Sequence, residues 1–224
     1  QKLDGIDVIY VISKQVYLEL TNEEQSMENI LCGRKSILGN VFLLKKIENY
    51  FKPEVAISIF GPTLWKPKCK HICGFAIPHY IYESESPFFQ RISFLNKLKH
   101  KIFKRTKIYL FKRNSDFLYS RFTIHAIDRK GEEKLVKWAA SNLKANGLFF
   151  VEVRSVKDEL YGIGEALGDN AYFTDHYRRF IILEELHQQF TSNGLDIIYS
   201  IESKGLAPYK TQDPVVIRLI AQKK

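Results

Sequence analysis

The stretch Leu148-Phe149-Phe150-Val151-Glu152-Val153-Arg154 is a short apolar run whose far end turns charged. A helix-like segment, 132–143, precedes it and is followed by Asn146-Gly147, a usual pairing after the end of a helix. A helix, a glycine, a buried strand and then charged residues are typical of a parallel α/β sheet. In such sheets ligands bind beyond the carboxyl ends of the strands. The order therefore predicts that Glu152 and Arg154 lie at a ligand-binding edge.

The composition predicts a globular protein. The chain has 224 residues, of which 45% are hydrophobic and 26% charged, enough for one sizeable core or two small ones. No apolar run approaches the length of a membrane span, and no signal peptide is visible. Three cysteines, Cys32, Cys69 and Cys73, are too few for a disulfide framework, which favours a reducing, cytoplasmic compartment.

The segment Cys69-Lys70-His71-Ile72-Cys73 invites interpretation as a metal site. It has no second ligand pair at the spacing of a zinc site, and its alternation of residue types suits a strand. We therefore expect no metal site.

The net charge of +9 is unevenly distributed. Residues 1–113 hold 19 Lys and Arg against 10 Asp and Glu, whereas residues 114–224 hold 15 of each. The difference favours two domains, 1–113 and 114–224, with different partners or different histories.

The first part contains the elements of a small α/β domain. A helix is expected from a cap at Ser36 to about Phe51, because its apolar residues fall near helical spacing. Three strands are expected, at 6–12, 54–60 and 72–77.

A resemblance enters at Phe60-Gly61-Pro62-Thr63-Leu64-Trp65-Lys66-Pro67, His71-Ile72-Cys73-Gly74-Phe75-Ala76 and Ile81-Tyr82. Together these residues resemble the acceptor-side domain of bacterial GT-B glycosyltransferases of the family-4 type, which build surface polysaccharides. The resemblance covers residues 1–118. It implies that Gly61 lets the backbone approach a sugar and that His71 or His79 faces the acceptor; the alternative for each histidine is a hydrogen-bonded loop or core residue. The family's donor domain has no counterpart here, so we expect no complete transferase of this type.

The segment Arg91–Arg113 is basic and amphipathic. No acidic residue occurs between Ser86 and Ser115, and apolar residues fall near one helical face. Such a helix can lie on an anionic membrane surface, which would suit a lipid-linked sugar acceptor. The alternative is a solvated helix whose apolar stripe packs on the sheet. No nucleic-acid-binding module accompanies the charge, so no nucleic-acid partner is expected.

The second part resembles the carboxyl half of class I S-adenosylmethionine (SAM)-dependent methyltransferases. Residues Tyr119-Ser120-Arg121-Phe122-Thr123-Ile124-His125-Ala126-Ile127 match the fourth strand and its loop, and Glu152-Val153-Arg154-Ser155 matches the end of the fifth. The run Thr174-Asp175-His176-Tyr177-Arg178-Arg179-Phe180 resembles the substrate loop of a bacterial branch often found beside polysaccharide genes. Segments 195–201 and 215–221 resemble the antiparallel hairpin that marks this fold, and 183–192 is expected to be helical.

The resemblance implies roles for residues of this part. Methyl transfer needs alignment and, for a hydroxyl acceptor, a base; His125 and His176 are the candidate bases. Substrate contacts are expected from Arg154, Asp158, Tyr161, Tyr177, Arg178 and Arg179, and cofactor contacts from Tyr119, Ser120 and Arg121. The arginines could clamp a carboxylate or phosphate by bidentate contacts. The alternative for Arg178-Arg179 is a surface pair bonded to Asp175 or Glu184.

One departure concerns the cofactor. Methyltransferases of this class hold the methionine end of SAM on a Gly-rich turn after the first strand, and an acidic residue after the second strand binds the ribose. No G-x-G turn follows a strand in this sequence. We therefore expect the substrate edge of a methyltransferase without a complete cofactor cradle, and weak or absent SAM binding.

Together the sequence predicts an α/β protein with a Rossmann-like three-layer sandwich, a mostly parallel sheet and a C-terminal antiparallel strand pair. The two resemblances meet near 114–119, as in a chimera, in which strands of the first part would fill the sheet positions of missing methyltransferase strands. Three functions stay open: a SAM-dependent methyltransferase-like protein acting on a sugar or glycan precursor, a glycosyltransferase remnant that binds a lipid-linked acceptor, and a catalytically inactive fusion. A cytoplasmic location, at most peripheral on the inner face of the membrane, is expected for each.

Overall fold

The computed structural model describes residues 6–59, 64–74, 93–114 and 116–224. The chain divides into two compact units, residues 1–54 and 55–224. The expected domain boundary at 113/114 lies inside the second unit, because strands from both sides of it pair in one sheet.

The first unit is small. Strand β1 (Tyr10–Ile12) pairs in parallel with β2 (Ile30–Cys32), and the helices are α1 (Lys14–Glu19), α2 (Asn22–Gln25) and α3 (Ile37–Phe51). The expected cap of α3 is confirmed: the Ser36 hydroxyl accepts a hydrogen bond from the Gly39 amide at 3.0 Å, which satisfies a donor left over at the helix start.

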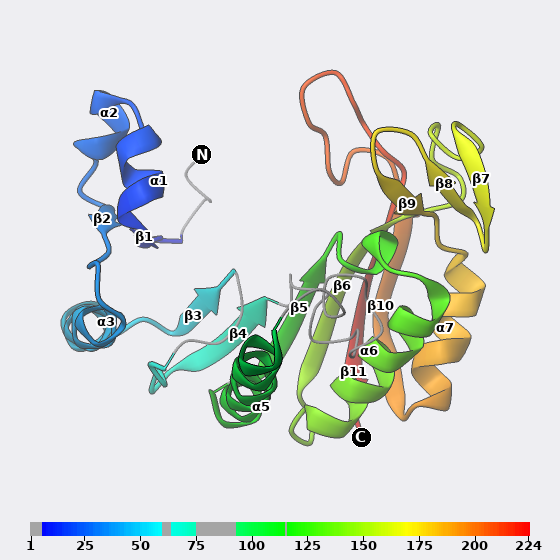
Figure 1. Cartoon of the computed structure of the whole chain (residues 1–224). Helices are drawn as coiled ribbons and strands as arrows, with labels where there is room; N and C mark the ends of the chain where they lie inside the picture. Colours follow the sequence, from blue (N-terminus) through cyan, green and yellow to red (C-terminus); the bar gives the residue numbers. More distant parts are fainter. Residues whose placement is uncertain (1–5, 60–63, 75–92, 115) are drawn as a thin grey trace. The chain divides into compact units, whose positions relative to one another are not determined.

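The second unit is built on a six-stranded sheet (Figure 1). In spatial order its strands are β10 (Leu195–Ser203), β11 (Val216–Lys223), β6 (Leu148–Arg154), β5 (Phe117–Arg121), β4 (Lys70–Gly74) and β3 (Val55–Ser58). Strands β3, β4, β5 and β6 are parallel, and β11 runs antiparallel to both β6 and β10. The expected α/β class, with a mostly parallel sheet and an antiparallel C-terminal pair, is confirmed.

The apolar stretch Leu148–Arg154 is an interior strand. Residue Val151 of β6 lies opposite Ser120 of β5 on one side and Leu219 of β11 on the other. The alternating side chains Phe149, Val151 and Val153 are at most 2% exposed. Burial of this kind contributes roughly 25 cal/mol per Å² of apolar surface, so the unit depends on this strand for its core.

Strands β3 and β4 extend the sheet beyond β5. Residues from the first part of the sequence therefore occupy this side of the sheet. The close packing needs a glycine at the end of β4: a Cβ on buried Gly74 would lie 1.9 Å from the Ile59 carbonyl oxygen. The expected strand at 72–77 is therefore seen as Lys70–Gly74, and its last three residues lie outside the described part of the chain.

Three helices cover one face of this sheet: α5 (Phe94–Asn114), α6 (Arg129–Asn142) and α7 (Leu183–Ser192) (Figure 1). Their packing shows in ring contacts, with Phe111 of α5 edge-on to Trp138 of α6 and Phe190 of α7 stacked on Phe149 of β6. Among the described elements of the second unit, no helix forms the expected third layer on the opposite face.

Two further elements stand beyond the carboxyl ends of β5 and β6 (Figure 1). One is the 3-10 turn η2 (Ile124–Ala126), which contacts both β6 and β9. The other is a three-stranded antiparallel sheet of β7 (Glu165–Gly168), β8 (Ala171–Phe173) and β9 (Tyr177–Arg179). This is the edge at which parallel sheets bind ligands.

Candidate functional site

Backbone hydrogen bonds bring the ends of β6 and β9 together. The Arg154 carbonyl accepts from the Ile181 amide at 2.9 Å, and the Ile181 carbonyl accepts from the Val156 amide at 3.1 Å. Because Ile181 follows Arg178 by three residues, these bonds hold Arg154 and Arg178 at the same edge of the unit.

A buried arginine fixes η2 against the same edge. The Arg179 guanidinium donates from Nε to the Ile127 carbonyl at 3.1 Å and also pairs with the Glu132 carboxylate of α6. Both side chains of this ion pair are less than 10% exposed. This burial and pairing favour a structural role for Arg179 over the expected contact with substrate.

The neighbouring Arg178 behaves differently because successive side chains of a strand point to opposite faces. Its Nη1 donates to the Thr174 hydroxyl at 2.9 Å and lies 3.3 Å from an oxygen of Asp175. The Asp175 partner agrees with one alternative that the sequence left open. No described residue accepts a hydrogen bond from the other guanidinium nitrogens of Arg178.

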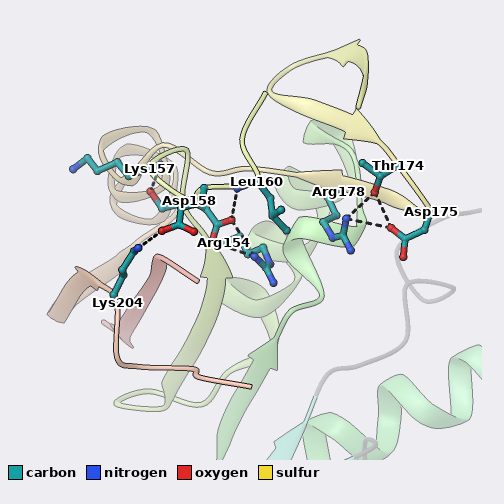
Figure 2. A network of polar contacts seen from close by, with 10 residues as sticks. Arg154, Lys157, Asp158, Leu160, Thr174, Asp175, Arg178 and Lys204 are labelled. Atoms are coloured by element: carbon teal, nitrogen blue, oxygen red, sulfur yellow. Dashed lines mark hydrogen bonds and ion pairs between the residues drawn. The ribbon is translucent and has the colours of Figure 1, made fainter. Parts of the chain in front are cut away.

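Arg154 is held by Asp158 in a similar way. Its Nη1 lies 3.0 and 3.1 Å from the two carboxylate oxygens of Asp158, which is 5% exposed. Asp158 also accepts from the Leu160 amide at 3.0 Å. Figure 2 shows the guanidinium groups of Arg154 and Arg178 pointing to the same side, with Leu160 between them in this view. Asp158 thus orients Arg154 and is too buried to bind substrate itself.

His125 sits on η2 beside these arginines. Its pKa is lowered to about 3, first by burial and then by the nearby charges of Arg154, Arg178 and His176. The Nδ1 atom is buried and has no hydrogen-bond partner among the described residues. At neutral pH the ring is therefore uncharged, and it is a weak base compared with an ordinary histidine.

His176 is the better placed base. Its Nδ1 lies 2.9 Å from the Asp175 carboxylate, and its side chain is 54% exposed. A carboxylate on one ring nitrogen orients the ring and leaves the other nitrogen to accept a proton. Hydrogen bonds from Thr174 and His176 hold the pKa of Asp175 far below its usual value, so this carboxylate stays charged. We call His125, Arg154, His176 and Arg178 the cationic site.

The two predicted tyrosines lie near the cationic site, in the segments that carry it. Tyr161 donates its hydroxyl to the Asn170 side chain at 3.0 Å and packs edge-on against Tyr172 and Phe180. Tyr177 is half-buried at the start of β9. Neither position tests the expected contact with substrate.

The site residues expected in the first part are not brought to this edge. His71 is fully buried on β4, and its Nε2 lies 2.8 Å from the Ser58 hydroxyl of β3. This corrects the expectation that it faces an acceptor and supports the core alternative. Gly61 and His79 lie outside the described residues.

The expected cofactor residues divide between the two faces of β5. Ser120 is fully buried under the helices, and its hydroxyl has no hydrogen-bond partner among the described residues. Tyr119 and Arg121 lie on the opposite face, where burial, followed by the charge of Glu152, raises the pKa of Tyr119.

A cross-strand row of charge lies beside them. The Glu152 carboxylate accepts a hydrogen bond from Nε of Arg121 at 2.7 Å and another from Nε of Arg218 at 2.7 Å. The strand register places these two arginines directly opposite Glu152, one on each neighbouring strand. Glu152 and Arg218, together with Tyr119 and Tyr199, border a hollow of about 200 Å³. Glu152 is thus satisfied by its neighbours rather than free at an edge. Arg218 was missed from sequence, although a lone arginine in the apolar run 215–221 is a visible signal.

The described residues fit SAM at one edge only. The carboxyl end of β4, next to β5, is where a Gly-rich turn would hold the methionine end, and the sequence contains no glycine between Gly74 and Gly131. Tyr119 and Arg121 offer polar groups on one side, with no convergent backbone donors from a glycine turn. The described part of the chain also contains no cluster of three or more His, Cys, Asp or Glu placed to hold a metal. Nor does it contain a helix long and apolar enough to cross a bilayer.

Comparisons with known proteins find distant structural similarities. No family model and no curated protein matches the chain. Solved structures that resemble it include SAM-dependent methyltransferases from Methanosarcina mazei (15% identity, TM-score 0.42), Anabaena variabilis (12%, 0.39) and Mesorhizobium loti (13%, 0.37). The matches cover 49%, 52% and 49% of this chain and 59%, 53% and 63% of those proteins, so the chain spans less than two thirds of their lengths. Because these TM-scores are below 0.5, the fold is defined here by the chain's own strand order.

Proposed function

We propose that this chain is a SAM-dependent methyltransferase-like protein that acts on a sugar or glycan precursor of surface-polysaccharide biosynthesis. One observation carries the proposal: antiparallel β11 lies between β6 and β10 in an otherwise parallel sheet, with the cationic site at its carboxyl edge. This is the strand pattern that the resemblance of residues 115–224 implies.

The roles follow from the geometry of the site. Arg154 and Arg178 bind and orient the acceptor, and His176, held by Asp175, takes a proton from its hydroxyl. SAM, when bound, would supply an electrophilic methyl group. Since the described residues fit only one edge of SAM, no further step is assigned to it.

The test is methyl transfer from labelled SAM at millimolar concentration to sugar acceptors, with the His176→Gln variant beside the wild type. Label should enter the acceptor with the wild type and fall at least about a hundredfold with the variant, in the range expected for loss of a general base. If wild-type protein is folded and binds the acceptor but transfers no label, the methyltransferase proposal is wrong. The catalytically inactive fusion is then the alternative that stands.

The glycosyltransferase alternative has less support. Much of its sequence resemblance lies in residues 60–63 and 75–82, outside the described part of the chain, and His71 is occupied in the core. We also propose a polysaccharide role, a cytoplasmic location and contact with the inner face of a membrane. The reason for this proposal is the basic helix α5.

A further inference from the structure

We propose that Arg154 and Arg178 together bind one oxyanion of the acceptor, a sugar phosphate or a sugar carboxylate, with the His125 ring against the bound group. The inference rests on the proposed function only in identifying the bound anion as the acceptor. Anion binding needs no SAM and can be measured without it.

The guanidinium groups keep donors for a ligand. Each arginine uses Nη1 for its own carboxylate partner, Asp158 or Asp175, and no described residue accepts from its Nε or Nη2. A planar guanidinium can bind a second oxyanion through these remaining donors. Because both partners are fixed by other hydrogen bonds, the arginines are already oriented before a ligand arrives.

The surroundings of His125 favour an anion in the same place. The guanidinium groups of Arg154 and Arg178 both act on its ring as positive charges, even though Asp158 and Asp175 lie close to them. The side chains of Arg154 and Arg178 are only 14% and 19% exposed, so water screens their charges poorly. The buried, unpartnered Nδ1 of His125 adds a polar atom that a ligand can satisfy.

Neutral sugars lack the group that this arrangement recognises. The site should therefore select acceptors such as hexose phosphates or uronic acids over unmodified hexoses.

The test is a nuclear magnetic resonance titration of the full chain without SAM. The probes are inorganic phosphate, glucose 1-phosphate, glucuronate and glucose, and the signals followed are the side-chain Nε of Arg154 and Arg178 and the ring of His125. Phosphate or carboxylate probes should shift all three residues with one dissociation constant, whereas glucose should shift none. Shifts by phosphate alone would assign the site to phosphorylated acceptors, and shifts by glucuronate alone would assign it to uronic acids.

Variants separate binding from folding. Arg178→Gln should weaken binding about tenfold, the loss expected for a charge-assisted hydrogen bond, and Arg178→Lys should weaken it less. The matched control is Arg129→Gln, because Arg129 is also an arginine paired with carboxylates, Asp169 and Glu185, and is not one of the residues of the cationic site. Equal affinity in Arg178→Gln and wild type, or equal shifts with glucose, would overturn the inference. Binding without methyl transfer would overturn only the proposed function.

Discussion

At the scale of single residues, the adjacent pair Arg178 and Arg179 shows how far sequence reasoning reaches. The sequence gives both the same interpretation, because both follow a histidine in a loop that resembles a substrate loop. The structure divides them by strand alternation, and only Arg178 keeps donors for a ligand. The partner that decides the role of Arg179, Glu132, is 47 residues away and carries no local signal.

We predict that Arg179→Met strongly destabilises the protein. It leaves the Glu132 carboxylate buried without its partner, and breaking a buried ion pair in this way costs roughly 3–5 kcal/mol. Urea denaturation should show the loss, and the double variant Arg179→Met with Glu132→Leu should recover much of it. Arg178→Gln is the matched control and should stay within about 1 kcal/mol of the wild type, because its partner Asp175 is exposed.

A second residue-scale prediction concerns His125 and acid. Burial and the nearby cations lower its pKa from 6.5 to about 3 in the folded protein, so the unfolded chain binds more protons between these values. Stability from this group is complete above pH 6.5 and is lost as pH falls toward 3, by up to about 1.4 kcal/mol per pH unit. Urea denaturation from pH 7 to 4 should therefore show a steeper fall for the wild type than for His125→Gln. Parallel curves would show that the ring is not shielded from water.

At the scale of elements, most of the fold was predictable. Helices and strands with strong periodicity or clear stops were placed well, including α7, whose expected and observed bounds agree. The antiparallel pair β10–β11 was predicted from the glycine and prolines between its strands. The pairing of β4 with β5 follows from contacts 45 residues apart, such as the Asp116 carboxylate accepting from the His71 amide at 3.0 Å. The sequence patterns are compatible with the pairing of β4 and β5 but do not predict it.

The helix α5 is buried near its end and exposed near its start. Leu110 and Phe111, near its end, are buried, as the packing alternative requires. Nearer its start, Leu95, Leu98 and Ile102 are 70%, 47% and 58% exposed among basic residues. An apolar face within a basic helix is suited to an anionic bilayer surface.

We therefore predict that the protein binds vesicles containing phosphatidylserine or phosphatidylglycerol and is released as salt rises, because ions screen the attraction within about 8–10 Å at moderate ionic strength. The variant Leu98→Glu with Ile102→Glu should lose most binding in a sedimentation assay. As a control, Leu167→Glu changes an exposed apolar residue of β7 and should bind like the wild type. Equal binding to neutral and anionic vesicles would contradict this role of α5.

At the scale of the whole molecule, the sheet joins residues from both sides of position 114, so the charge asymmetry of the sequence does not mark a boundary between compact units. The strands β4 and β3 extend the sheet from β5. The position of a strand in the sheet does not determine the turn that follows the strand. A cofactor is held by groups that converge from several turns, so a correct strand order can coexist with an incomplete ligand site.

The last prediction follows from this difference between sheet and turns. Calorimetric titration with SAM should give a dissociation constant much weaker than 10 µM, because most of the ligand would stay in water and affinity depends on burial and converging polar groups. Binding of phosphate or glucuronate to the cationic site in the same preparation would show that the carboxyl edge is folded, so weak SAM binding could not be attributed to unfolded protein. Low-micromolar SAM binding requires about −7 to −8 kcal/mol, which one edge formed by Tyr119 and Arg121 cannot provide. Such a result would mean that the segment after Gly74 forms a cradle without glycine, and the residues between 75 and 92 would then be the first to substitute.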